Sequence, residues 1–412
     1  MGETQKVWAV ERRANSMNLD TLLPEETIAI RKQVRDFADR VLRPIAHELN
    51  TTPESRDGFR HDVFNAMAEA GLYEIPYPTD VGGLGLEYPT LATLTVLEEI
   101  AYYSPGIASA MYDGQAILVG TTLDKIGGPI RAEWLPKLIK GEFVGSFATS
   151  EPEASTELSS RATRTKARRV KGGWRLNGRK RWITNSVVAD RAIILCLAEG
   201  AMSTLFVDMH SEGVTVTDPD LKMGNHAQLT ADIIFDNVFV PDEDMLGQTG
   251  DGLRTMLGAL ALGRLGIGAV GVGMAQRAID VAAHYTSQRE VFDQPIARFQ
   301  HWQFKFAEHA MEIEATRTLY QKASLSLDKG GNAEPLAAMV KVKGSTLAVD
   351  VARDAIQACG GYGFARHMHG ANQSWPLESI YRDAKIGEIY EGANEVQKWV
   401  IARHLLGRNI TG

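Results

Sequence analysis

Residues 171–178 have the sequence KGGWRLNG, and the periodicity of the chain changes around them. The paired glycines predict a β-hairpin with Gly172-Gly173 as its turn. Short segments that alternate between apolar and polar residues follow at 180–183, 191–198, 203–208, 214–217 and 231–240. Turn residues separate them, so we predict a small β domain over residues 145–248, either a barrel or a sandwich.

The sequence is helical on both sides of this β segment. Upstream, apolar residues recur at steps of three and four, which predicts a helix beginning near Pro24 and others near 61–70, 90–102, 106–126 and 131–139. Downstream, the same pattern predicts helices at 252–289, 300–328, 334–359 and 394–406. The predicted class is α+β, with an α-helical domain (20–144), the β domain (145–248) and a second helical domain (249–412).

Composition excludes several classes of protein. The 412 residues carry a net charge of −7 and are 44% hydrophobic, which is typical of a soluble globular protein without a nucleic-acid footprint. The most apolar stretch, residues 256–275, is rich in Gly and Ala and contains Arg264, which predicts a buried helix rather than membrane insertion.

The N-terminal residues and the cysteines indicate the cellular compartment of the protein. The first 20 residues lack the apolar core of a secretory signal, so we expect a cytoplasmic protein, or one of the mitochondrial matrix if the source is eukaryotic. Cys196 and Cys359 are far apart in apolar surroundings, which indicates buried free thiols and no metal site.

One carboxylate near the end of the chain is a candidate for chemistry. Glu391 lies in the segment IYEGANEVQ (389–397), directly before Gly392. Burial beside such a backbone bend would raise its pKa and make it a stronger base. The same Glu-Gly pair is also typical of a helix end or a turn, and the string alone leaves both interpretations open.

Five further segments are separated along the chain. They are FATSEPEASTE (147–157), KRWITN (180–185), GR (263–264), REVFDQPIARFQ (289–300) and QACGGYG (357–363), all of them upstream of YEG (390–392). The residue types in these segments and their order along the chain resemble those of the acyl-CoA dehydrogenases, a family of FAD-dependent enzymes. The resemblance covers about residues 20–410. The resemblance implies an N-terminal α domain, a central β domain and a C-terminal four-helix bundle. It also implies an acyl-CoA substrate, an electron-transfer flavoprotein as electron acceptor, and a homo-oligomer, in most members a tetramer.

The resemblance implies two FAD-binding segments in the β domain. Residues 147–157 are similar to the family loop that runs along the flavin, with Ser150, Ser155 and Thr156 in place of the usual Thr, Gly and Ser. In KRWITN, Trp182 would cover a flavin edge and Thr184 would lie near N5, whereas this segment alone predicts only a strand with one core Trp. The cofactor residues implied here are Phe147, Thr149, Ser150, Ser155, Thr156, Trp182, Ile183 and Thr184.

A second group would reach the FAD of a neighbouring subunit at its diphosphate and adenine. It comprises Arg289, Phe292, Gln300, Gln357, Gly360 and Gly361. An arginine suits this place because its guanidinium pairs with two phosphate oxygens at once. Taken alone, Arg289 would be a surface charge at a helix end, and the glycines would be a helix stop.

Glu391 matches the catalytic base of the family. Some members carry the base just before the arginine that aligns with Arg264, but here that residue is Gly263, so no carboxylate competes. Glu391 would take the α-proton while flavin N5 takes the β-hydride, and its backbone N–H with a flavin ribityl hydroxyl would stabilise the thioester oxygen. The substrate residues implied are Thr156, Leu262, Gly263, Arg264 and Gly392. Two more cofactor residues are Glu395 and Ala393, the latter in place of a common Thr.

Several alternatives stay open. Within the same fold, an acyl-CoA oxidase, a flavin monooxygenase or a nitroalkane oxidase would use oxygen. A non-catalytic relative associated with nucleic acid would need a basic surface, which the acidic composition disfavours. The segment 365–375 is longer than the corresponding segment of the family. They form either a surface extension or a border of the substrate mouth or a subunit contact, with Arg366 and two histidines meeting a polar acyl group.

Overall fold

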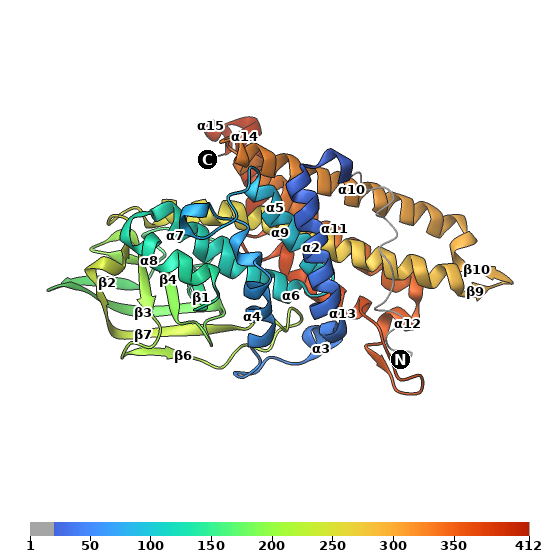
Figure 1. Ribbon diagram of the computed structural model, residues 1–412, viewed down its shortest axis with the longest axis horizontal. Helices are drawn as coiled ribbons and strands as arrows, with labels where there is room; N and C mark the ends of the chain where they lie inside the picture. Colours follow the sequence, from blue (N-terminus) through green and yellow to red (C-terminus); the bar gives the residue numbers. More distant parts are fainter. Residues whose placement is uncertain (1–19, 412) are drawn as a thin grey trace.

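The computed structural model describes residues 20–411, and it places a curled β-sheet at one end and a long helical bundle at the other (Figure 1). The predicted order of an α, a β and a second α portion is confirmed. The domain boundaries predicted at residues 144 and 248 fall between elements and stay predictions. The prediction on a secretory signal concerns residues that lie outside the described part, apart from Asp20.

The N-terminal portion is helical. Its elements are η2 (Asp20–Leu22), α2 (Glu25–Phe37), η3 (Ala38–Leu42), η4 (Arg43–Ile45), α3 (Ala46–Thr51), α4 (His61–Glu69), η5 (Leu72–Glu74), η6 (Thr79–Val81), α5 (Pro89–Ala101), α6 (Pro105–Ile107), η7 (Ala108–Gly120), α7 (Thr121–Ile126) and α8 (Gly128–Ile139). The helix predicted at 106–126 is continuous, but its middle, η7, is a π-helix. Such wide turns are rare, and they are frequent at functional sites.

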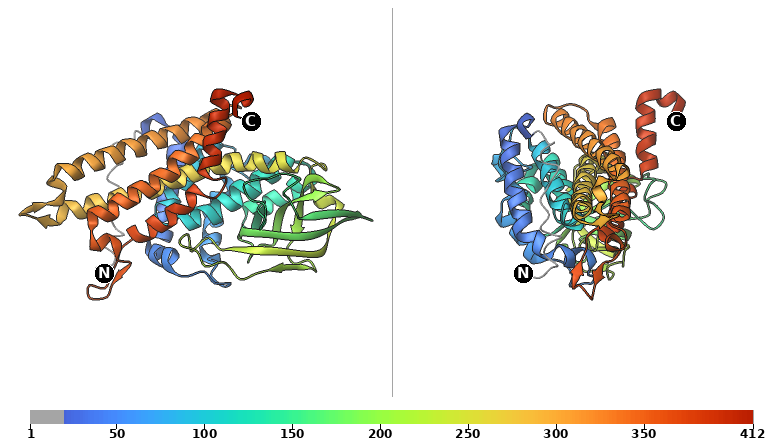
Figure 2. Two further views of the ribbon diagram at one scale, coloured as in Figure 1. Left: turned by 180° about the vertical axis from the view of Figure 1, so that it is seen from behind. Right: turned by 90° about the vertical axis from the view of Figure 1, so that its right-hand side faces the viewer.

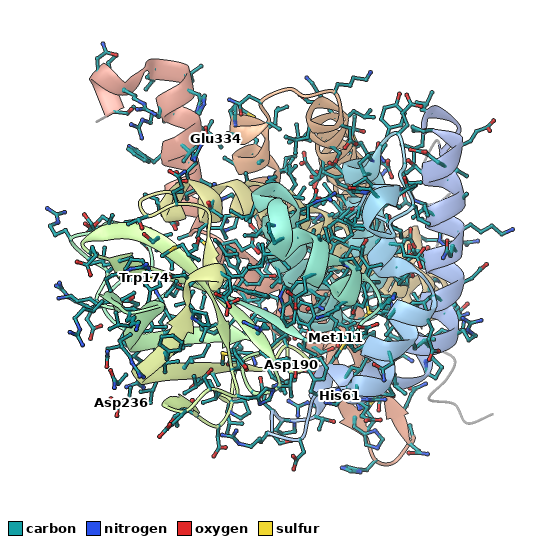
Figure 3. The ribbon with its side chains drawn as sticks, turned by 60° about the vertical axis from the view of Figure 1, so that its left-hand side comes forward. His61, Met111, Trp174, Asp190, Asp236 and Glu334 are labelled. Carbon is teal, nitrogen blue, oxygen red and sulfur yellow. The ribbon has the colours of Figure 1, made fainter. Side chains whose placement is uncertain are left out.

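Eight strands form the sheet. They are β1 (Gly145–Ala148), β2 (Lys166–Val170), β3 (Gly173–Thr184), β4 (Arg191–Ala198), β5 (Ala201–Asp208), β6 (Val214–Val216), β7 (Thr230–Pro241) and β8 (Met245–Leu246), with η8 (Asp242–Asp244) before the last. The order is β6-β7-β3-β2-β4-β5-β8, and β1 pairs with β4. Side chains from β3, β4, β5 and β7 share one core, in which Trp174 lies, whereas Met111 belongs to the helical core (Figure 3).

Two details of the predicted hairpin are wrong. Val170 pairs with Gly173, so the turn is Lys171-Gly172, one residue earlier than predicted. The strand predicted at 180–183 is not separate either, because β3 continues through it to Thr184. The predicted break lies at Gly178, where the pairing of β3 with β7 shifts between Leu176 and Gly178 without ending the strand. A second shift, a β-bulge between Lys180 and Ile183, lies inside the segment predicted as a strand.

The C-terminal portion is built on four helices that Figure 2 shows from two sides: α9 (Gly252–Gln288), α10 (Gln300–Asp328), α11 (Glu334–Cys359) and α14 (Asn394–Leu406). Shorter elements join them, namely β9 (Glu290–Val291), β10 (Gln294–Pro295), η9 (Ile296–Arg298), α12 (Gly361–Phe364), α13 (Leu377–Ala384), η10 (Lys385–Glu388) and α15 (Arg408–Thr411). By length and composition α9 could cross a membrane, but 72% of its most apolar window is buried inside the protein. It is a core helix, as the sequence predicted.

Helices α9 and α11 cross without intervening side chains. A β-carbon on Gly271 would lie 2.2 Å from the carbonyl oxygen of Gly344, and one on Gly344 would lie 2.5 Å from the carbonyl oxygen of Gly268. Only glycine permits this approach, because any other residue would overlap the facing backbone. Glycines of the 256–275 stretch therefore set the distance between α9 and α11.

Residues 365–375 form a hairpin of β11 (His367–Met368) and β12 (Gln373–Ser374) that projects from the bundle away from the sheet (Figures 1 and 2). Arg366 forms an ion pair with Glu378 at 3.3 Å, and His367 bonds to the Ser374 hydroxyl. Trp375 is buried against Tyr285 and Tyr362. This geometry fits the surface extension.

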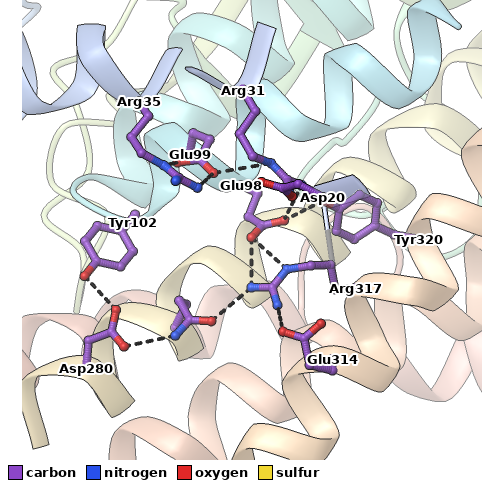
Figure 4. Close-up of polar contacts among 11 residues, drawn as sticks. Asp20, Arg31, Arg35, Glu98, Glu99, Tyr102, Asp280, Glu314, Arg317 and Tyr320 are labelled. Atoms are coloured by element: carbon purple, nitrogen blue, oxygen red, sulfur yellow. Dashed lines mark hydrogen bonds and ion pairs between the residues drawn. The ribbon is translucent and has the colours of Figure 1, made fainter. Parts of the chain in front are cut away.

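A cluster of buried charges joins α2, α5 and α10 (Figure 4). Glu98 accepts hydrogen bonds from Arg317 at 3.0 Å and from the Tyr320 hydroxyl, and Arg31 lies against both Glu98 and Glu99. Burial opposes ionisation here, but the charges of Arg317 and Arg31 lower the pKa of Glu98 to about 2. The cluster therefore keeps its charges, and each ion depends on the others for compensation.

We expect Glu98→Leu to lower the free energy of unfolding by about 3–5 kcal/mol, because it leaves two buried arginines without their shared carboxylate. Urea unfolding followed by circular dichroism measures the loss. The folded pKa of Glu98 lies below its ordinary value of 4.5, so its stabilisation is present above pH 4.5 and is lost as the pH falls toward 2.

The control is Arg161→Ala, which removes an exposed ion pair with Glu157 and is expected to leave unfolding unchanged. Equal effects of the two substitutions would contradict the role given to the buried cluster.

Candidate active site

A cavity of about 410 Å³ lies where the N-terminal helices, the sheet and the C-terminal bundle meet. Its size is in the range of small-molecule sites. Its wall comes from η7, β1 and the loop after it, the end of β3, α9, the segment before α14, and α14 itself. The cavity thus has a β wall and a helical wall.

The β wall begins with a loop that a buried ion pair holds in place. Lys180 on β3 donates to Glu151 at 2.9 Å and to the carbonyl oxygen of Thr149 at 3.0 Å, and Glu151 also accepts the backbone N–H groups of Arg164 and Thr165. Burial opposes the charge, but Lys180 and these hydrogen bonds keep the pKa of Glu151 below its usual value. Strand β1 and the loop after it present five predicted residues to the cavity, Phe147, Thr149, Ser150, Ser155 and Thr156.

The end of β3 completes this wall. Trp182 adopts a left-handed backbone with φ of 57° at the β-bulge. It lines the cavity and is 54% exposed. A bulky residue in this conformation is strained, and such strain is concentrated at functional sites. The Thr184 hydroxyl accepts a hydrogen bond from Gln228 at 3.0 Å, and Ile183 also lines the cavity.

Glu391 dominates the helical wall. Its φ of 54° is left-handed, and Gly392 follows with φ of 93°, so the chain bends sharply and turns the Glu391 carboxyl into the cavity. Arg264 on α9 donates to the carbonyl oxygen of Glu391 at 3.1 Å. Gly263 leaves the space that the carboxyl occupies, since a β-carbon there would lie 2.2 Å from its Oε2.

The electrostatics favour a base at this position. The residue keeps some exposed surface, but its Oε2 is buried, and burial raises the pKa of Glu391. A hydrogen bond from Asp113 and the charges of Arg264 and Lys341 limit the rise. Burial also lowers the pKa of Lys341 to about 8. The raised pKa of Glu391 agrees with the interpretation of the sequence.

Sequence reasoning missed Asp113, Ser109 and Gln228, all of which line the cavity. Asp113 is 2% exposed, and burial together with Glu391 raises its pKa well above the usual value. A signal existed, because Asp113 is the only charged residue in the otherwise apolar stretch 100–123. Periodicity does not show that this residue meets one that lies 278 positions later in the chain.

Family models match three consecutive parts of the chain. The N-terminal domain of acyl-CoA dehydrogenase matches residues 24–142, the middle domain 146–238 and the C-terminal domain 250–406. The chain belongs to the acyl-CoA dehydrogenase family. It is therefore an FAD-dependent oxidoreductase that acts on a CH–CH group.

Individual relatives agree over nearly the full length. The chain is 36% identical over 388 residues to 3-(aryl)acrylate reductase of Clostridium sporogenes, covering 93% of this chain and 99% of the relative. Among solved structures it resembles butyryl-CoA dehydrogenase from Megasphaera elsdenii, with a TM-score of 0.86, 30% identity, and coverage of 93% and 99%. It also resembles a chain in a structure of the electron transferring flavoprotein of Acidaminococcus fermentans, with a TM-score of 0.87, 31% identity, and coverage of 94% and 100%.

The cavity of this acyl-CoA dehydrogenase fits FAD. The β wall combines the flat faces of Phe147 and Trp182 with the hydroxyls of Thr149, Ser150, Ser155, Thr156 and Thr184. An aromatic ring system with polar edges needs this combination of apolar contact and short hydrogen-bonding groups. The helical wall, with Arg264, Glu391 and Gly392, faces the same space.

Four residues predicted for this site are not among the residues that line the cavity, and one of them, Gly263, only leaves space for the Glu391 carboxyl. Leu262 packs on the helical core, because two residues along a helix from Arg264 it points to another face. Glu395 is exposed in the first turn of α14, and Ala393 is the residue that precedes this helix. The insertion 365–375 does not line it either, so within one chain Arg366 and the histidines do not meet this cavity, and a subunit contact stays a prediction.

The second predicted group lies elsewhere. Arg289, Phe292, Gln357, Gly360 and Gly361 line a separate cavity of about 590 Å³ at the far end of α9, while Gln300 is not among its lining residues. Arg264 and Arg289 are 25 residues apart, about 37 Å along a helix. Phe292 is 91% exposed. One chain does not bring the two groups together.

We expect Gly263→Ala to slow flavin reduction by acyl-CoA about 100-fold, because its methyl group displaces the Glu391 carboxyl by about 1 Å or more. Stopped-flow absorbance of the flavin measures the rate, and thermal unfolding tests the fold. Because alanine favours helix by about 1 kcal/mol over glycine, stability should not fall in parallel.

The matched control is Gly258→Ala on the same helix, where an added β-carbon meets nothing within 4 Å. Normal rates in both variants would show that Glu391 does not need the space beside Gly263.

Proposed function

We propose that this protein removes hydrogen from Cα and Cβ of an acyl-CoA thioester to give the 2-enoyl-CoA, with Glu391 as the base. The observation that carries the proposal is the buried Glu391 carboxyl, which a strained bend turns into the cavity opposite the β wall. An α C–H is weakly acidic, so a desolvated carboxylate with a raised pKa suits its removal. FAD, when bound, supplies the acceptor for the β-hydride.

The polypeptide also offers a place for the thioester oxygen. The backbone N–H of Glu391 has no acceptor among the described residues, although its carbonyl oxygen is engaged by Arg264. A free N–H beside the base can stabilise the negative charge that develops on the thioester oxygen as the α-proton leaves. The same left-handed bend therefore positions both the base and this donor.

The remaining site assignments belong to the same proposal. Thr184 and Trp182, with Ile183 between them, would hold the flavin ring, and the loop from Phe147 to Thr156 would follow it toward the phosphates. Gly263, Arg264 and Gly392, with Thr156, would border the acyl thioester. Leu262, Ala393 and Glu395 would act only through the backbone or from the edge, since their side chains do not line the cavity.

An electron-transfer flavoprotein is the proposed electron acceptor. The similarity to a chain solved in a structure of such a flavoprotein supports it. An oxygen-using relative would instead form peroxide from acyl-CoA without a carrier protein. The related 3-(aryl)acrylate reductase is named for reduction of a double bond, so aryl-substituted acyl groups belong in any substrate panel.

We expect anaerobic titration with one class of acyl-CoA to bleach the visible absorbance of the FAD-loaded protein. The panel runs from short linear to branched, aromatic and dicarboxylic thioesters. Glu391→Gln keeps the size and removes the base, so bleaching should slow by about 10² to 10⁴-fold. Binding of the product enoyl-CoA, measured by its shift of the flavin spectrum, shows that the variant retains the site.

The proposal fails if FAD-loaded protein is bleached by no thioester, or if Glu391→Gln is bleached at the wild-type rate. Rapid peroxide formation in air, with no gain in turnover from an electron-transfer flavoprotein, would move the protein to the oxidase branch.

We also propose that the active form is a homo-oligomer, a tetramer by analogy with the family. The support is the distance between the two groups of predicted FAD residues, which one molecule of cofactor bound to one chain does not bridge. In this arrangement Arg289, Phe292, Gln300, Gln357, Gly360 and Gly361 of one subunit complete the site of the next. Phe292, exposed at the tip of the bundle, is then covered by the neighbour.

Mixed assemblies test this arrangement. Arg289→Ala alone should bind FAD weakly, and Glu391→Gln alone should bind FAD but turn over slowly. Co-expressed, the two chains should regain activity, because some sites then combine an intact Glu391 with an intact Arg289. Separately purified variants mixed without exchange of subunits are the control, and absence of any recovery in co-assembled protein would contradict the shared site.

A further inference from the structure

Asp113 shares the active-site cavity with Glu391, and the proposed reaction does not yet use it. The residue lies on the π-helical turns of η7, and its Oδ1 is buried. The backbone of Gly266 and the side chain of Leu97 enclose it, since a β-carbon on Gly266 would lie 2.8 Å from Oδ1 and 2.9 Å from Leu97. No cation faces the Asp113 carboxyl among the described residues.

The two carboxyl groups are partners of each other. Oδ1 of Asp113 and Oε2 of Glu391 are both buried and receive no N–H or O–H from any other described residue. Oε2 of Glu391 lies beside Gly263 and Oδ1 of Asp113 beside Gly266, one turn further along α9, and both residues line the same cavity, so the two carboxyl groups lie within hydrogen-bonding reach. Two ionised carboxylates so close would repel strongly, whereas one proton between them supplies the missing donor.

The surroundings decide which residue holds this proton. Arg264 on α9 and Lys341 on α11 place positive charge near Glu391 and stabilise its ionised form. Burial and the Glu391 charge raise the pKa of Asp113, and the buried phenol of Tyr390, which also lies near it, stays neutral. The negative charge therefore resides on Glu391 and the proton on Asp113.

We propose that Asp113 is a positioning residue whose protonated carboxyl donates a hydrogen bond to Glu391, so that the base works as a carboxyl–carboxylate pair. The proposal rests on Glu391 being the base. The hydrogen bond occupies one oxygen of Glu391 and fixes the plane of the carboxylate. The other oxygen is then directed toward the α-proton of the substrate.

Other groups titrate around the pair. Lys341, with its pKa lowered to about 8, faces Glu391 from α11 and itself interacts with Glu388 and Glu395. Arg264 faces Glu391 from α9 and interacts with Glu334. From the Glu391 segment itself, the buried Tyr390 bonds to Ser109 on η7 and stays neutral, since burial raises its pKa. The acid side of a pH profile, below the range of Lys341, therefore reports on the pair.

The first test measures how kcat/KM for flavin reduction depends on pH in wild type, Asp113→Asn and Asp113→Ala. The acid limb is the part of this pH profile in which kcat/KM falls as Glu391 is protonated. Asparagine still donates to Glu391, so the limb should stay near its wild-type position. Alanine removes a donor to a charged group, worth about 1.5–3 kcal/mol, so the pKa of Glu391 rises and the limb should move to higher pH by about one to two units. A role in folding alone would lower the amount of active protein without moving the limb.

Asp383→Asn is the matched control. This aspartate is also buried, burial raises its pKa to about 7, and it accepts the backbone N–H of Asn225 rather than contacting Glu391. Its substitution should leave the acid limb in place. An acid limb that coincides in Asp113→Ala and wild type would overturn the proposal.

The second test does not need turnover. Infrared spectra of the FAD-loaded protein, recorded at a pH well above the pKa of about 7 of Asp383 so that this control residue is ionised, should show the carbonyl band of a protonated carboxyl that is lost in Asp113→Asn and kept in Asp383→Asn. Absence of that band in wild type overturns the pair. If the band is present but no thioester reduces the flavin, the pair stands and the proposed dehydrogenase function fails, so the two failures are distinguishable.

Discussion

The close crossing of α9 and α11 is the constraint on which the active site depends. Because Gly268, Gly271 and Gly344 bring the two backbones into contact, α11 has one fixed position against α9. Lys341 on α11 then donates to Asn394 at 2.8 Å and thereby holds the start of α14. The bend that contains Glu391 directly precedes this point, so the crossing ultimately fixes the base opposite Arg264.

Two buried acidic residues on the N-terminal helices show that the neighbouring groups determine whether a buried carboxyl group is ionised. Glu98 on α5 is surrounded by Arg31 and Arg317, and it stays ionised although it is desolvated. Asp113 on η7 meets another carboxyl instead, and it keeps its proton. Burial is common to both residues. The first arrangement joins helices together, and the second places a proton beside the candidate base.

The sequence predicted the elements well where a single period runs for many residues. The helix predicted at 252–289 is α9, Gly252–Gln288, because its apolar residues dominate a long stretch. The hairpin turn was one residue off, since two adjacent glycines do not specify which of them adopts the turn. The β-bulge at Trp182 was missed for a related reason, because a local change of pairing leaves no trace in composition.

The active site was predictable only through resemblance, and only in part. Glu391, Arg264 and the β wall were found because whole motifs match a family. The pairs that hold them, Lys180 with Glu151 and Asp113 with Glu391, join residues far apart in sequence, and no local pattern connects such residues. For the same reason the sequence did not predict the cavity residues that do not belong to a motif, such as Gln228.

Helix α9 also fixes the distance and the relative rotation between the two cavities. It carries Arg264 at one cavity and runs without interruption to Gln288, directly before Arg289 at the other. One inserted or deleted residue would rotate one end by about 100° and shift it by about 1.5 Å relative to the other. The length of this segment is therefore restricted far more tightly than that of the projecting 365–375 hairpin. Natural variation in length should accumulate in the hairpin and avoid the helix.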